Sequence, residues 1–295
     1  MPGGGENSPN PALLHSPNPL TAMKIFLPLA LLFAAGASLS ATAQSAAEPQ
    51  FQLSCQDGNW SRNGNDKHHF CETRDLTMAA PAGQPLAIDG GANGGITVHG
   101  WAGTTVLIRA KVQSWSSTAA KAQARVKSVS IGTANNTLRA SAPNDNDHYS
   151  VTYEVFVPRQ TALVLNTVNG GINLDNLQAD IKFHAVNGGV SLANLGGQVT
   201  GQTVNGGLNI ALGGTQWEGK GLDVETTNGG IEWKLPPAYS AQFFTSTDLG
   251  NIHSGLPVTK SGFMHKEVTA NLGKGGAPVK AVTTNGGITL DQGHD

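Results

Sequence analysis

Apolar and polar residues alternate over short stretches along most of the chain, which predicts a fold built mainly from β-strands. Clear examples are residues 105–112 and 150–157, the second of which stops at Pro158. The segment 117–126 is different, because Ser and Thr are followed there by alanine-rich helix formers. We expect this segment to be a helix and nearly everything else to be strand and turn.

The motif Asn-Gly-Gly followed by an aliphatic residue occurs six times along the chain. A fixed spacing of 18 residues separates Asn169, Asn187 and Asn205, and regular spacing is typical of a repeat architecture. Leu249-Gly250-Asn251 looks like a degenerate copy, 36 residues before the last one. The complete copies are Asn93-Gly94-Gly95, Asn169-Gly170-Gly171, Asn187-Gly188-Gly189, Asn205-Gly206-Gly207, Asn228-Gly229-Gly230 and Asn285-Gly286-Gly287.

The residues around each copy predict two strands joined by a corner. Positions six, four and two before each asparagine are apolar or small, and alternation resumes after the corner. Asn and Gly tolerate positive φ, so we expect that conformation at the corners and a large loss of stability for Gly170→Val or Gly188→Val. Stacked repeats would also let the asparagines form a ladder. We predict an all-β fold with a β-solenoid or rolled β-sheet over 161–291; a meander of hairpins is the alternative.

The N-terminal part predicts export. Lys24 precedes a short apolar run, and small residues follow that end in Ala41-Thr42-Ala43, as in a secretory signal peptide at 23–43. The run is short for a permanent anchor. Residues 1–22 are interpreted as a non-folding extension or an over-extended start. The mature chain would then hold an N-terminal β region at 44–160 and the repeats at 161–291, together one continuous domain at 44–291, with no integral membrane segment.

Two cysteines, Cys55 and Cys71, lie near the predicted mature N-terminus. In an oxidising compartment such a pair predicts a disulfide. His68 and His69 leave a metal site as the alternative, although no fourth ligand is evident.

Candidate chemistry is sparse. A net charge of −2 gives no reason to expect nucleic acid as a partner. Asp223 and Glu225 share one face of a predicted strand, with Glu232 just across the corner, so that a cation site or an acid/base pair is conceivable beside a plain solvated face. Trp101 and Trp217 are candidates for stacking on a sugar, whereas Trp233 has the inward phase. No motif of a hydrolase, metalloprotease, calcium-binding β-roll or phosphate-binding loop occurs.

From Cys55 to Leu290 the chain resembles a bacterial family of exported β-strand-repeat proteins named as candidate adhesins. The resemblance rests on the repeats, on Asn93-Gly94-Gly95-Ile96 leading to His99-Gly100-Trp101, on residues 153–158 and on residues 217–230. It implies the β-repeat fold but supplies no catalytic residues.

Export, a stackable core and the lack of converging reactive groups favour a non-catalytic envelope or cell-surface protein without cofactor or metal, whose partner is a glycan or a protein. A periplasmic structural or stress-linked scaffold and a polysaccharide-active β-solenoid enzyme are the alternatives.

Overall fold

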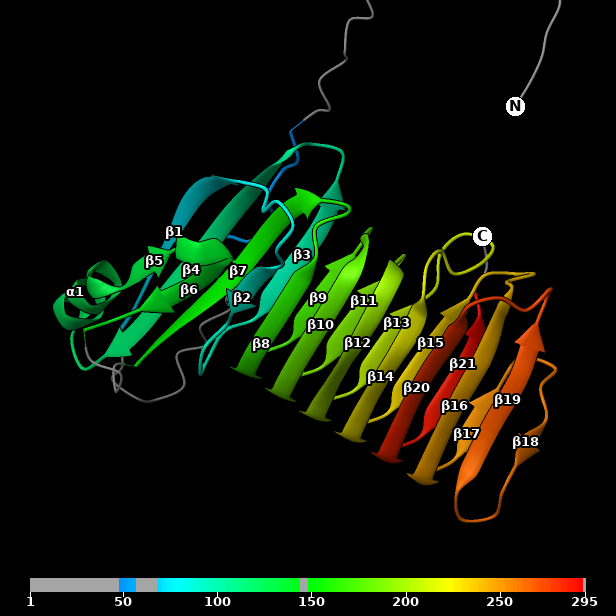
Figure 1. Ribbon diagram of the computed structural model, residues 1–295. Coiled ribbons are helices and arrows are strands. Elements are labelled where there is room, and N and C mark those ends of the chain that lie inside the picture. The colour runs from blue at the N-terminus through cyan, green and yellow to red at the C-terminus, as the bar shows by residue number, and fades with distance from the viewer. Residues whose placement is uncertain (1–47, 57–67, 144–147, 294–295) are drawn as a thin grey trace, which may run out of the picture. The chain divides into compact units, whose positions relative to one another are not determined.

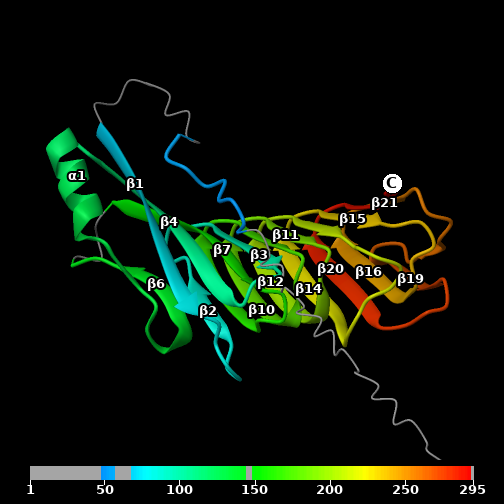
Figure 2. The ribbon, with the colours of Figure 1, turned by 90° about the horizontal axis from the view of Figure 1, so that it is seen from above.

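Two β-sheets face each other and enclose the hydrophobic core (Figures 1 and 2). The structure is a computed structural model that describes residues 48–56, 68–143 and 148–293. The predicted extension at 1–22 and the predicted signal peptide at 23–43 lie outside the described residues. Within the described ranges, no helix is both long enough and apolar enough to cross a membrane.

The first sheet contains ten strands of the described chain. Their spatial order is β1 (His68–Ala79), β4 (Thr105–Ser116), β7 (Tyr149–Pro158), β3 (Ile96–Trp101), β9 (Ile172–Asp175), β11 (Val190–Ala193), β13 (Leu208–Ala211), β15 (Ile231–Leu235), β21 (Ile288–Gln292) and β17 (Ile252–Ser254).

The second sheet contains eleven strands among the described residues. Their spatial order is β18 (Lys260–Ser261), β19 (Lys266–Leu272), β16 (Ala241–Leu249), β20 (Pro278–Asn285), β14 (Gly221–Asn228), β12 (Gly196–Asn205), β10 (Gln178–Asn187), β8 (Leu163–Asn169), β2 (Leu86–Asp89), β6 (Thr137–Ser141) and β5 (Ser130–Gly132).

Each repeat contributes one strand to each sheet. A strand of the second sheet runs into an Asn-Gly-Gly corner, the chain crosses to a short strand of the first sheet, and it then returns to the next coil. Neighbouring coils pair in parallel and in register, so that Val190 lies between Ile172 and Leu208. Hairpins would pair antiparallel. The parallel pairing therefore confirms the predicted β-solenoid-like fold and excludes the meander.

The order of the coils in space differs from their order in the sequence. The last copy of the repeat, β20 and β21, lies between the β14–β15 coil and the β16–β17 coil. Leu249 pairs with Asn285, so the degenerate copy is a genuine corner that occupies the outermost coil. The 36-residue spacing between Leu249 and Asn285 arises because the chain first forms the outermost coil, β16–β17, and the β18–β19 hairpin. It then returns to form the β20–β21 coil between that coil and β14–β15.

The N-terminal half covers the opposite end of the solenoid. The β2–β3 coil pairs with the β8–β9 coil, although residues 102–162 separate β3 from β8 in the sequence. Within that insertion α1 (Ala119–Ser128) confirms the expected helix, shifted by two residues from 117–126. The Thr118 side chain caps its first turn by accepting a hydrogen bond from the Lys121 amide. The helix contacts β1 and β4 at this end of the fold (Figure 2).

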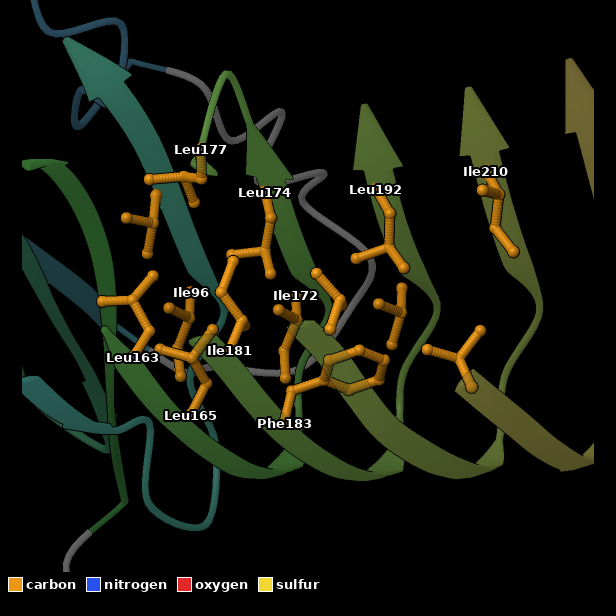
Figure 3. Close-up of a cluster of buried hydrophobic side chains, with 14 of the residues drawn as sticks. Ile96, Leu163, Leu165, Ile172, Leu174, Leu177, Ile181, Phe183, Leu192 and Ile210 are labelled. Atoms are coloured by element: carbon orange, nitrogen blue, oxygen red, sulfur yellow. The ribbon is translucent and has the colours of Figure 1, made fainter. Parts of the chain in front are cut away.

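The core is a continuous stack of aliphatic side chains between the sheets. Leu163, Leu165, Ile181 and Phe183 from the second sheet meet residues such as Ile172 from the first sheet (Figure 3). These positions are the ones that the alternation predicts to point inward. Because one coil cannot bury its apolar face alone, stacking makes the core continuous from coil to coil.

The corner glycines are needed for a reason other than the expected one. None of the Asn-Gly-Gly glycines has a positive φ. Instead, the first glycine of each corner lies against the coil next to it: a β-carbon on Gly188 would be 2.0 Å from the Gly170 carbonyl oxygen, and one on Gly206 would be 2.1 Å from that of Gly188. Close approach of two backbones thus excludes a side chain there. Positive φ occurs in the return turns, at Asn176 and Asn194.

Two sets of side-chain hydrogen bonds follow the stack at these corners. The corner asparagines form an exposed ladder in which each amide nitrogen donates to the side-chain oxygen of its neighbour, as from Asn187 to Asn169 at 2.9 Å and from Asn205 to Asn187 at 2.8 Å. Buried threonines bond to the backbone instead. The Thr203 hydroxyl, for example, donates to the Gly188 carbonyl at 2.8 Å. The asparagines therefore bond to one another, and the threonines satisfy the corner carbonyls.

We expect Gly188→Ala to lower the free energy of unfolding by about 2–4 kcal/mol, because the added methyl group has to displace the neighbouring backbone. The matched control is Gly189→Ala, whose β-carbon would be 3.6 Å from the Gly207 carbonyl oxygen and should cost less than about 1 kcal/mol. Denaturant unfolding measures both. Equal losses for the two variants would contradict the stacking explanation.

Candidate functional site

A polar hollow on the outer face of the second sheet is the candidate site. It has a volume of ≈ 400 Å³ and crosses β10, β12, β14 and β20. Its lining residues are Lys182, Phe183, His184, Thr200, Gly201, Gln202, Asp223, Glu225 and Lys280. The structure thus brings Asp223 and Glu225, the two carboxylates singled out in the sequence, together with lysine, histidine and amide groups from neighbouring coils.

The hollow coincides with a break in the repeat. In β12 an inward position is occupied by Gly201, where the neighbouring strands carry Phe183 and Val224. A β-carbon on Gly201 would be 2.5 Å from the ring of Phe183, so that ring occupies the space of the missing side chain. Outside, the hollow is flanked by the hydroxyl of Thr200 and the amide of Gln202. The second sheet therefore presents a shallow polar depression at this point.

The charges of the hollow are only partly paired. The Asp223 carboxylate lies 3.1 Å from the Lys280 ammonium group. The Gln202 amide nitrogen lies 3.1 Å from Nδ1 of His184, a geometry that lets the ring accept a hydrogen bond. Lys182 and Glu225 make no ion pair or hydrogen bond with other described residues. A cation and an anion thus remain available to a ligand within one hollow.

The three-carboxylate hypothesis is wrong. Glu232 belongs to β15 in the first sheet, where it pairs with Lys234 at 3.0 Å, while Asp223 and Glu225 belong to the second sheet. The described residues contain no group of three or more His, Cys, Asp or Glu side chains that could hold a metal ion. The predicted disulfide between Cys55 and Cys71 is present, so the alternative of a metal site at these cysteines is wrong as well.

Trp217 and Trp233 offer no surface for stacking on a sugar. Trp217 is only 5% exposed, and its indole nitrogen donates to the Gly197 carbonyl at 3.0 Å. Trp233 is fully buried, as its inward phase predicts, and meets Phe243 edge to face. Trp101 is half-buried and bonds to the Thr105 carbonyl. No binding role follows for Trp217 or Trp233.

A second polar cluster escaped the sequence reasoning. On the first sheet, His99 lies between two carboxylates, with Nδ1 2.6 Å from Asp175 and Nε2 3.6 Å from Glu154. The hydrogen bond with Asp175 raises the pKa of His99, and burial partly opposes this rise.

Glu154 also holds the N-terminal strap (residues 48–56) on the sheet. The nearly buried carboxylate accepts the backbone amides of Gln52, at 2.9 Å, and Leu53, at 2.7 Å. Phe51 of the strap packs on Phe156 and on the Arg109 guanidinium. Because the strap and Glu154 lie about a hundred residues apart in the sequence, local alternation offered no signal for this contact. The cluster is therefore structural, and it fastens the strap.

We expect the stabilising contribution of His99 to depend on pH. Its pKa is raised in the folded state, so the contribution is fully present below the unfolded value of about 6.5 and is lost as the pH rises through the folded value. The difference in melting temperature between the wild type and His99→Asn should therefore be larger at pH 5.5 than at pH 8.5. His253→Asn serves as the control. A difference in melting temperature that is the same at both pH values, or larger at pH 8.5, would contradict a raised pKa of His99 in the folded state.

The stacked parallel coils and the exposed polar hollow define the class of the molecule: a β-solenoid-like repeat protein. The chain belongs to the Toastrack DUF4097 family, whose model matches residues 51–291.

Similar solved structures share little sequence with this chain. A candidate cell adhesion protein from Clostridium sporogenes has 10% identity and a TM-score of 0.41, with 75% of this chain and 100% of that chain covered. A candidate adhesin from Bacteroides fragilis has 14% identity and a TM-score of 0.36, with 76% and 97% covered. No curated protein matches the chain by sequence.

Proposed function

We propose that this protein is an exported, non-catalytic binding scaffold of the bacterial envelope or cell surface, and that the polar hollow of the second sheet receives a glycan or protein ligand. The observation that carries the proposal is the hollow itself. Lys182 and Glu225, which pair with no other described residue, stand there beside the hydroxyl of Thr200 and the amide of Gln202. Such groups recognise hydroxyl, amide and charged groups of a partner.

The arrangement favours binding over catalysis. Asp223 is engaged with Lys280, and the hollow is shallow and open to water, whereas efficient acid/base chemistry needs groups that converge on an enclosed reacting atom. A polysaccharide-active enzyme remains the alternative of another class. It would be supported if the pure protein cleaved a polysaccharide and Asp223→Ala or Glu225→Ala abolished the cleavage.

The binding test is a glycan array, followed by titration of any glycan that binds. The double substitution Lys182→Ala/Glu225→Ala should weaken binding about tenfold or more, because it removes the two charges that pair with no other described residue. Asn209→Ala on the first sheet is the matched control, since this asparagine is also exposed but lies on the other sheet. Equal affinity for the double variant and the wild type would show that the ligand binds elsewhere than in the hollow.

The site of action is tested by cell fractionation and by protease treatment of intact cells. The predicted signal peptide leads us to expect export. Digestion on intact cells would support a surface binding role. Protection until the outer membrane is opened would favour the second candidate, a periplasmic structural or stress-linked scaffold. Retention in the cytoplasm would contradict both.

A further inference from the structure

The most exposed hydrophobic side chains gather at one end of the solenoid. Among the described residues, the exposed large hydrophobic side chains are Phe263 at 92%, Met264 at 71%, Leu249 at 63% and Val168 at 43%. Phe263 and Met264 lie in the turn between β18 and β19, and Leu249 lies at the outermost corner. We call Leu249, Phe263 and Met264 the apolar tip. Solvent-exposed clusters of this kind mark interaction sites.

Polar contacts fix the base of the tip in place. Nδ1 of His265 lies 2.6 Å from the Asp248 carboxylate. The Lys266 ammonium group donates to the Gly250 carbonyl and to the Asn251 side chain, both at 2.7 Å. These contacts tie the hairpin turn that carries Phe263 and Met264 to the outermost corner, which carries Leu249. Figure 1 shows this turn beside the end of β16, at the edge where the corners lie.

The degenerate corner supplies Leu249, one of the three side chains of the apolar tip. Leu249 stands in register with Asn285, at a position where the other coils carry the ladder asparagine. The backbone keeps the corner geometry, because a β-carbon on Gly250 would be 2.0 Å from the Gly286 carbonyl oxygen. The corner has changed at two positions: an exposed leucine replaces the ladder asparagine, and Asn251 replaces the second glycine. The change therefore alters the surface while the stack is preserved.

We infer that the apolar tip inserts into the interfacial region of a phospholipid surface. The tip projects from the end of a hairpin, and two or three side chains are too few for a stable protein interface, which buries about 800 Å² on each partner. Shallow insertion into a bilayer needs only a few apolar side chains with polar groups behind them. Lys260 and Lys266 lie at the base, where lipid headgroups would be.

The charges near the tip predict little selectivity between lipids. Lys260 and Lys266 are balanced by Asp248 and Glu267, both of which face His265. Insertion should therefore depend mainly on apolar burial, and vesicles of zwitterionic phosphatidylcholine should bind nearly as well as vesicles that contain phosphatidylglycerol. This inference uses a surface other than the polar hollow and does not rest on ligand binding there.

The test is flotation of the predicted mature chain, residue 44 onward, with large unilamellar vesicles of phosphatidylcholine, with and without phosphatidylglycerol. Phe263→Ser/Met264→Ser should lower the vesicle-bound fraction about tenfold, since most of the inserted apolar area is lost. Val168→Ser, an exposed position at a different corner, should bind like the wild type. All three sites are exposed, so melting temperatures should agree among the proteins and exclude a folding defect.

Results of two kinds, from flotation and from light scattering, would overturn the inference. One is a wild type that stays at the bottom of the gradient, or a double variant that floats as well as the wild type. The other is a wild type that is a dimer by light scattering without lipid while the double variant is a monomer, because the tip would then be a contact between two copies.

Discussion

The fold depends on how closely one backbone corner lies on the next. Parallel strands in adjacent coils are separated by about 4.8 Å, and at the corner a carbonyl group points along the stack toward its neighbour. The Gly188 carbonyl shows both consequences: it excludes a β-carbon at Gly206 and accepts the Thr203 hydroxyl. The Gly206 carbonyl does the same with Gly229 and Thr226. Glycine and threonine therefore recur together because each coil must accommodate and satisfy the carbonyl of the coil beside it.

A stack held by such contacts needs protected ends, because an open sheet edge invites pairing with other chains. At one end, the long strands β1 and β4 continue the first sheet antiparallel to β7, and α1 packs against them. At the other end, β19 runs antiparallel along β16, and Leu256 and Val258 pack against the core beside β17. Both ends thus change from parallel coils to antiparallel pairing, so that the regular parallel stack does not continue to either edge.

The sequence predicts the local structure well and the long-range arrangement poorly. Alternation and the 18-residue spacing identify the inward residues and the stacked repeats, and the alanine-rich composition after Ser and Thr identifies the helix, because these follow from local geometry. The position of the last repeat could not be predicted, since the corner at Asn285 fits next to any other corner and only tertiary pairing places it beside Leu249. The role of Glu154 could not be predicted either. Its outward position in the alternation predicts a solvated side chain, but a strap from a distant part of the chain covers it. The burial of Trp217, which lies between strands, has no periodic signal.

The surfaces proposed for binding lie where the chain departs from its own repeat. Gly201 replaces a larger inward side chain at the hollow, and the Phe183 ring fills the space left inside the core, so the stack is kept. Leu249 replaces an exposed asparagine, and the Gly250 backbone keeps the corner beneath it. In both cases the corner glycines still lie against the carbonyl group of the neighbouring coil, and the residue that differs stands at a position without that contact. A regular solenoid can therefore carry specific surfaces wherever a side chain points away from the carbonyl of the neighbouring coil, and these positions are free to change with function.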